Sequence, residues 1–300
     1  MNTILPKEIR EIKTILKKSC IRLVSNFSIT KIQKAPRVYE IINNRTIALK
    51  IFPIKNKDYV ISSMYFYKLA AKHKIPVPKF ISFGNNKNIC WIMYEWIEGK
   101  VLSQLKTKQE RFKSAVEVGK YLRKLHSTKI NNSKQKSFIY PIKSNYDFFV
   151  NKINIFTQKG VKVISSKDIK KIINITSSLQ IEKVPPSLLH GDVTGGNIII
   201  PAKKGEPALY FFDPGKIMYG DPMCDLGYSQ TSLVSEEFRT GVYEGYILKN
   251  RLSKQEYERF KLWRLLRQIV ITQRAKYQND PKAKQLIHKR YLSKLLNNYT

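Results

Sequence analysis

The segment LLHGDVTGGNIII, residues 188–200, constrains this chain more than any other part of its sequence. His190 and Asp192 follow two leucines, and Asn197 stands five residues after the aspartate, in front of an apolar run. A second apolar run ends in YFFDPG and places Asp213 sixteen residues after Asn197. The two runs predict short strands around a tight, glycine-rich loop, with polar side chains at the strand ends.

These residue types suit phosphoryl transfer, which needs little covalent help from a protein. A carboxylate must accept the proton of the acceptor hydroxyl, and oxygen ligands must hold Mg²⁺ across the phosphates. Mg²⁺ prefers hard oxygen ligands, which carboxylates and amides provide. Asp192 is therefore the candidate catalytic base, and Asn197 and Asp213 are the candidate catalytic metal ligands.

The pattern HGDxxxxN followed by DPG resembles the group of aminoglycoside phosphotransferases, choline kinases and fructosamine kinases, which belongs to the protein-kinase-like superfamily. The segment GDPMCDLGYS, residues 220–229, resembles the GDPxxDLA segment of that group. LRKLH at 122–126 resembles the end of its long central helix. The resemblance implies that Asp225 braces the catalytic loop and that His190 gives structural support to the site.

The N-terminal part of the chain carries the same resemblance, which covers roughly residues 30–230. Lys50, in IALKIF, resembles the lysine that holds phosphates in kinase folds. IPVPKFISFG resembles the PVPxxL segment of the group, and IMYEWIEG resembles its hinge. The resemblance implies that Met93, Tyr94 and Trp96 lie at the nucleotide base, so these residues and Lys50 are the candidate nucleotide-binding set.

The pattern of the chain changes near Glu98 and Gly99. Before this point, an amphipathic helix at 5–18, short strand-like runs and a helix at 58–73 predict a small antiparallel sheet with a helix on it. After it, the chain is mostly helical. We therefore expect an α+β, two-lobed protein-kinase-like fold. Residues 1–98 would form the nucleotide-binding N-lobe with its N-terminal helix, and residues 99–300 the helical C-lobe with the catalytic loop and acceptor site.

Two features depart from the pattern of the group. The loop that should cover the phosphates reads IQKAPRVYE and contains no glycine, so contacts from Lys34 and Arg37 are the alternative. The helix after Lys50 should provide a glutamate, but residues 59–73 contain no acidic side chain. These departures keep open a catalytically silent pseudokinase that binds a nucleotide or RNA.

The charge of the chain is strongly positive, with 55 Lys and Arg against 22 Asp and Glu. A polyanionic partner, such as RNA, an acidic surface or a phosphorylated glycan, is one interpretation; compositional drift toward Lys, Asn and Ile is the other. Residues 249–300 hold 14 basic and 3 acidic side chains, so a polycationic acceptor is disfavoured. Arg264 and Arg267 are the candidate contacts to an anionic acceptor, because a guanidinium binds two oxygens at once.

We therefore expect transfer of the γ-phosphate of ATP or GTP, with Mg²⁺, to a hydroxyl of a small molecule such as an anionic sugar or glycan. A kinase acting on RNA or protein is an alternative, because HGDVTGGN also resembles the HGDLTTSN of small RNA-modification-associated kinases. No apolar run approaches the ~18 residues of a membrane-spanning helix, and the first residues do not resemble a signal peptide. The expected location is the cytoplasm.

Overall fold

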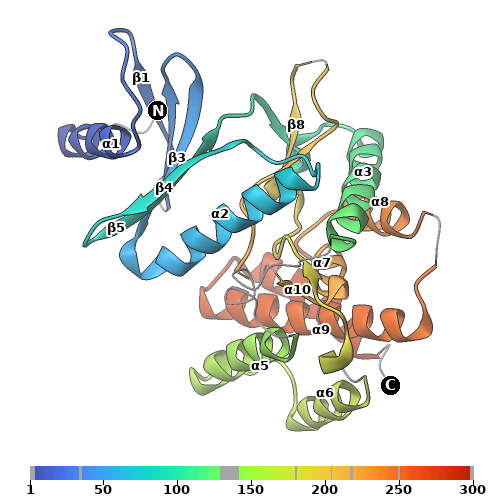
Figure 1. Ribbon diagram of the computed structural model, residues 1–300. Coiled ribbons are helices and arrows are strands. Elements are labelled where there is room, and N and C mark those ends of the chain that lie inside the picture. The colour runs from blue at the N-terminus through green and yellow to red at the C-terminus, as the bar shows by residue number, and fades with distance from the viewer. Residues whose placement is uncertain are drawn as a thin grey trace. The chain divides into compact units, whose positions relative to one another are not determined.

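The computed structural model describes residues 4–33, 36–128, 142–179, 181–203, 205–216, 219–248 and 251–297. The chain divides into two compact units. Figure 1 shows their elements, coloured by residue number from the N-terminus to the C-terminus. One unit contains residues 1–99 and 201–212, and the other contains residues 100–200 and 213–300. The sequence predicts a single boundary after residue 98, whereas in the structure residues 201–212 also belong to the first unit. One unit is built on an antiparallel sheet and the other on helices, which confirms the α+β class.

The first unit is a five-stranded antiparallel sheet with the strand order β1-β2-β3-β5-β4. Its elements are α1 (Pro6–Lys18), β1 (Ser28–Gln33), β2 (Arg37–Ile42), β3 (Thr46–Pro53), η1 (Ile54–Asn56), α2 (Lys57–Lys72), β4 (Phe80–Asn85) and β5 (Ile89–Glu95). The central strand β3 is buried on both faces. Successive side chains of a strand point to opposite faces, so each face of β3 must be covered by a different element.

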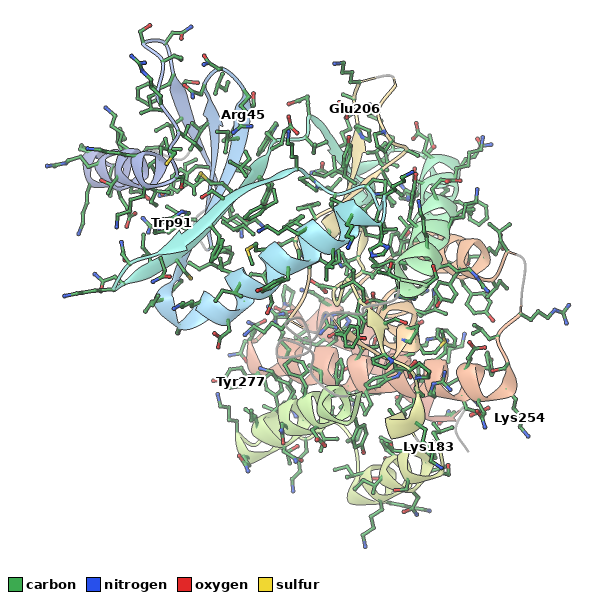
Figure 2. The ribbon with its side chains drawn as sticks, in the orientation of Figure 1. Arg45, Trp91, Lys183, Glu206, Lys254 and Tyr277 are labelled. Carbon is green, nitrogen blue, oxygen red and sulfur yellow. The ribbon has the colours of Figure 1, made fainter. Side chains whose placement is uncertain are left out.

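Helix α1 covers one face of this sheet and α2 covers the other. Ile12, Ile15 and Leu16 of α1 are buried in one apolar cluster with the odd-numbered residues of β3 and β5, including Trp91, which is labelled in Figure 2. On the opposite face, the ring of Tyr67 from α2 lies 5.3 Å from that of Tyr94. Lys50 pairs with Ile92 across the strands and shares this second face.

A buried carboxylate attaches α1 to the sheet. Glu8 accepts hydrogen bonds from Lys31 Nζ at 2.5 Å, from Tyr39 Oη at 2.7 Å and from the Leu5 amide at 3.0 Å. Burial alone would raise the pKa of Glu8, but these hydrogen bonds outweigh it and lower the pKa to about 2. Glu11, one turn further along, pairs with Arg37 of β2.

The second unit is built mainly from helices. Its helices are α3 (Lys108–His126), α5 (Ile142–Gln158), α6 (Ser166–Ser178), α7 (Pro222–Tyr228), α8 (Glu236–Ile247), α9 (Lys254–Tyr277) and α10 (Lys282–Asn297). Its shorter elements are η2 (Leu102–Gln104), η3 (Ile181–Lys183), β7 (Ser187–Leu188), η4 (Gly195–Asn197) and β10 (Tyr219–Gly220). Strands β6 (Gly99–Val101), β8 (Ile198–Pro201) and β9 (Tyr210–Phe211) stand at or near the points where the chain passes between units.

Helix α3 packs unusually close to α8. A Cβ added at Gly245 would lie 2.0 Å from the Val116 carbonyl oxygen, so only glycine permits this approach. Helix α3 begins with a capping box, in which the Thr107 hydroxyl accepts a hydrogen bond from the Glu110 amide and the Glu110 carboxylate accepts one from the Thr107 amide.

The described part of the chain contains no helix that is both long and apolar enough to span a bilayer.

Replacement of Glu8 by glutamine tests the attachment of α1. Because the carboxylate ionises more readily in the folded chain, its contribution to stability is complete above about pH 4.5 and is lost as the pH falls toward 2. We expect Glu8→Gln to lower the free energy of unfolding by about 1–3 kcal/mol at pH 7, and by progressively less between pH 4.5 and pH 2. Urea unfolding followed by tryptophan fluorescence measures this.

The matched control is Glu11→Gln, which removes a pair whose side chains are 27% and 29% exposed. We expect a smaller loss of stability from it, because exposed ion pairs contribute little. A difference between wild type and Glu8→Gln that stays constant from pH 7 to pH 2 would contradict the assignment.

Candidate active site

The catalytic loop follows β7 and carries Asp192, whose side chain is 38% exposed. Asn197 Nδ2 lies 2.9 Å from both the Oδ2 and the backbone oxygen of Asp192, and it donates to both. Arg267 Nη2, from α9, lies 3.3 Å from Asp192 Oδ1. Both carboxylate oxygens of Asp192 are therefore held by cationic or amide donors. The structure thus brings together Asp192, Asn197 and Arg267.

A buried carboxylate holds the backbone of this loop. Asp225, at the middle of α7, is fully buried; its Oδ2 accepts from the His190 amide at 2.6 Å and its Oδ1 from the Gly191 amide at 2.7 Å. His190 is itself buried, and its Nδ1 lies 3.3 Å from the Asp192 amide. These contacts fix the two residues that precede Asp192, as the bracing role implied for Asp225 would require.

The brace extends to two further helices. His126 Nε2, at the end of α3, lies 3.2 Å from Asp225 Oδ2, and its Nδ1 lies 2.9 Å from Tyr246 Oη of α8. A carboxylate can only accept, so Nε2 carries the proton and Tyr246 donates to Nδ1 when the imidazole is neutral. Burial raises the pKa of Tyr246, which keeps its hydroxyl protonated. The sequence motifs include His126 but contain no signal for Tyr246, because α8 enters the site only through folding.

The DPG segment lies against the catalytic loop. The Gly215 amide donates to the His190 carbonyl oxygen at 2.7 Å, and a Cβ at this position would lie 2.2 Å from the Gly191 oxygen. Asp213, two residues earlier, has a φ of 56°, in the left-handed region that non-glycine residues rarely adopt. Backbone strain of this kind concentrates at functional sites. Asp213 is thereby held near the loop that carries Asp192 and Asn197.

A cavity of about 560 Å³ opens beside Asp192 within the second unit. Its wall includes polar and charged side chains from the catalytic loop, α3 and α9, namely Asp192, Thr194, Asn197, Arg111, Arg267 and Arg274. Leu102, Leu233, Val234 and Phe238 provide its apolar part. The cavity wall therefore contains three arginines and one carboxylate, and one of the arginines, Arg111, is paired with Glu237 at 3.8 Å.

The two arginines predicted to contact an acceptor have different surroundings. Arg267 lies in the cavity wall, with its guanidinium carbon 4.0 Å from the centre of the Tyr228 ring. Arg264 does not line the cavity. Its Nε donates to the Gln230 carbonyl oxygen at 3.0 Å and its Nη2 to the Tyr291 hydroxyl. Arg264 leaves α9 from a different side of the helix, toward α10, where it joins elements of the second unit.

In the first unit, Lys50 is only 6% exposed, and its Nζ lies 5.9 Å from the centre of the Phe212 ring. Tyr94 lies on the same face of the sheet, whereas Met93 belongs to the apolar cluster on the α1 face. The structure therefore separates the Met93 side chain from Lys50. Trp96 follows β5, and its Nε1 lies 3.2 Å from Glu98 Oε2.

The structure contains both departures from the kinase pattern, the loop without glycine before β2 and the missing glutamate on α2. Lys34 lies outside the described residues, and Arg37 pairs with Glu11 of α1. Helix α2 buries Ser63 and Met64 where the pattern calls for a glutamate.

The described residues contain no cluster of three or more His, Cys, Asp or Glu side chains that could hold a metal. A Mg²⁺ ion that is shared with phosphates needs only one or two protein carboxylates. Asn197 and Asp213 fit this requirement. The Asn197 amide nitrogen is occupied at Asp192, so its Oδ1 is the atom left to act as a ligand.

The chain is similar in sequence to known proteins. The sequence model of the phosphotransferase enzyme family matches residues 33–263, a range that contains Asp192, Asn197, Asp213 and Asp225 and ends before Arg264. A stretch of 91 residues is 36% identical to a probable ketoamine kinase of Staphylococcus aureus (strain NCTC 8325 / PS 47). This stretch spans 30% of the chain and 29% of that relative.

Solved structures share the fold. A putative fructosamine-3-kinase from Haemophilus somnus 129PT matches with a TM-score of 0.66 and 17% identity, over 96% of this chain and 95% of its own. An amicoumacin kinase solved with AMP-PNP and Ca²⁺ matches with a TM-score of 0.64 and 15% identity, over 98% and 96% of the two chains. These matches confirm the expected protein-kinase-like fold.

Replacement of Asp225 by asparagine tests the brace. The variant keeps one acceptor oxygen but places an NH₂ group against the donors of the loop, in a fully buried position. We expect it to lower the free energy of unfolding by about 3 kcal/mol, because it leaves buried polar groups unpaired. Urea unfolding measures the change. The exposed Asp147→Asn on α5 is the matched control, and equal stabilities of the two variants would contradict the bracing role.

Proposed function

Since the chain belongs to the phosphotransferase enzyme family, we propose that it transfers the γ-phosphoryl group of ATP or GTP to a hydroxyl of a small anionic acceptor, such as an anionic sugar or glycan. The family match establishes the class of reaction, whereas the acceptor and the role of each residue are our proposal. One observation supports the proposed phosphoryl transfer more strongly than the others. Asp192 stands in the wall of a cavity with its carboxylate oriented by Asn197 and Arg267.

In this proposal Asp192 is the catalytic base. Its carboxylate accepts the proton of the acceptor hydroxyl as that oxygen forms its bond to phosphorus. The bond from phosphorus to the oxygen of the leaving nucleoside diphosphate breaks, and the proton is held on Asp192. Asn197 and Arg267 hold the carboxylate in place, so little reorganisation is needed during the reaction.

The nucleotide, when bound, supplies the phosphoryl group. Asn197 Oδ1 and the Asp213 carboxylate would hold Mg²⁺, because both are hard oxygen ligands and Asp213 is fixed close to the catalytic loop. Lys50 is proposed to hold phosphate oxygens, and its burial in β3 supports a positioned rather than a solvated ammonium. Tyr94 and Trp96, at the end of β5, are proposed to lie at the base, while Met93 would approach it only through its backbone.

The charge of the cavity supports an anionic acceptor over a polycation. Three arginines line it: Arg111 is paired with Glu237 and Arg267 with Asp192, whereas Arg274 has no acidic partner among the described residues. Two of them, Arg267 and Arg274, lie beyond residue 263, where the family match ends. The alternatives of an RNA substrate and an anionic surface find no support in the comparisons. The cytoplasm, where ATP and GTP are abundant, is the location that fits this proposal.

Replacement of Asp192 by asparagine tests the enzyme. We expect the purified wild-type protein to hydrolyse ATP or GTP slowly in the presence of Mg²⁺, with water as the acceptor. Asp192→Asn should lower this rate at least about 100-fold, because removal of a general base typically costs this much or more. Release of inorganic phosphate measures the rate. Asp58→Asn, an exposed change on α2, is the control. Equal rates in wild type and Asp192→Asn would favour the silent pseudokinase.

Replacement of Asp213 by asparagine separates metal binding from nucleotide binding. We expect the variant to need at least about tenfold more Mg²⁺ for half-maximal turnover, because a charged ligand is replaced by a neutral one. Its affinity for the nucleotide without metal should be unchanged or slightly higher. Release of inorganic phosphate at increasing Mg²⁺ concentrations measures the first quantity, and calorimetric titration of the nucleotide with and without Mg²⁺ measures the second. An equal loss of nucleotide affinity under the two conditions would show that Asp213 acts on something other than the metal.

A further inference from the structure

A second cavity, of about 620 Å³, lies in the same helical unit, where α5, α9 and α10 meet. Its wall combines aromatic side chains from α5 and α9 with cations from all three helices. The aromatic residues are Phe148, Phe156 and Tyr277; the cations are Lys152, Lys159, Arg267, Arg274 and Lys284. Tyr277 closes the end of α9 and is labelled in Figure 2. The cavity is thus an aromatic cleft with a cationic rim.

This cavity adjoins the one at Asp192. Leu233, Arg267 and Arg274 line both cavities. The two cavities are therefore neighbours along one face of α9, with these three side chains common to both walls. Arg267 marks the end that holds the catalytic aspartate.

The geometry of α9 sets the distance between the two ends. Arg267 and Arg274 are seven residues apart, which is two turns of an α-helix, so their side chains leave the same face of α9. At 1.5 Å of rise per residue, their Cα atoms are about 10 Å apart along the helix axis. A molecule that spans both positions must be elongated.

The cations at the far end have no acidic partner. Among the described residues, Lys152, Lys159 and Arg274 form no salt bridge; Lys159 Nζ lies 4.7 Å from the centre of the Tyr277 ring, and Arg274 Nε donates to Gln278 Oε1 at 3.0 Å. The acidic residue of the cavity wall, Asp280, is paired with Lys284 at 2.9 Å. The cavity therefore carries an excess of positive charge that an anion would neutralise.

From these observations we propose that the second cavity binds a phosphate group of the acceptor, on Arg274, Lys152 and Lys159, while the hydroxyl to be phosphorylated lies at Asp192. The inference rests on the proposed function and narrows its substrate class to elongated, hydroxyl-bearing phosphate esters. The aromatic rings of Phe148 and Phe156 would pack against the part of the acceptor that joins its two ends.

Phosphate binding to the protein with an occupied nucleotide site tests the inference. Inorganic phosphate is titrated by calorimetry into protein that is saturated with ADP and Mg²⁺, in wild type, Arg274→Gln and the double variant Lys152→Gln, Lys159→Gln. We expect millimolar binding in wild type and a loss of at least about fivefold in each variant, since each removes charge-assisted hydrogen bonds. Arg290→Gln on α10 and Lys170→Gln on α6, both exposed and outside the cavity wall, are the matched controls and should bind as wild type does.

Absence of phosphate binding in wild type, or equal binding in wild type and Arg274→Gln, would overturn the inference. A second arm distinguishes the source of the phosphate by comparing hexose 6-phosphate with phosphatidylcholine vesicles that carry phosphatidic acid. Arg274-dependent binding of the soluble ester supports a small acceptor. Binding of the vesicles alone would overturn the substrate class proposed here.

Nucleotide hydrolysis on the same wild-type preparation separates this inference from the proposed function. Hydrolysis that depends on Asp192, without phosphate binding that depends on Arg274, would refute the anion site and leave the proposed function standing. Arg274-dependent phosphate binding without such hydrolysis would refute the proposed function and leave the anion site standing.

Discussion

The loop that carries Asp192 depends on one buried carboxylate, that of Asp225, which accepts hydrogen bonds from the amides of His190 and Gly191. A fully buried carboxylate is tolerated only when donors satisfy it, and here two backbone amides and an imidazole do so. The same group therefore fixes the backbone before Asp192, the end of α3 through His126, and α7, which carries it. The position of the proposed base is in this way a consequence of how the helical core closes around Asp225.

Helix α9 is buried in the core along one side and lines the two cavities along the other. Its buried side contains Trp263, whose Nε1 donates at 2.7 Å to the fully buried Asp221, and Arg259, which approaches the same carboxylate at 3.0 Å. Burial raises the pKa of Asp221, while Arg259 and Trp263 act against that rise. Its other side presents Arg267 and Arg274 to the two cavities. The arginines of the cavity walls are therefore carried by a helix whose other side is buried in the core of the unit.

The net charge of +33 acquires a more specific meaning from this arrangement. Some of the basic residues of the C-terminal helices are used structurally, as Arg264 is at Gln230 and Arg259 is at Asp221. Others, such as Arg274 and Lys152, line a cavity without an acidic partner among the described residues. In the first unit, Lys31 and Arg37 hold α1 to the sheet through Glu8 and Glu11. These basic residues thus have distinct local roles.

The sequence alone determined the local elements and the motif residues. Its apolar periods predicted the strands and helices, and HGDVTGGN and DPG contain Asp192, Asn197 and Asp213, because local spacing and turn chemistry are written in neighbouring residues. Only the tertiary structure decided that Arg267 reaches Asp192 while Arg264 does not, that Tyr246 completes the brace, and that residues 201–212 return to the first unit. These outcomes depend on contacts between segments far apart in the chain, which no single segment encodes.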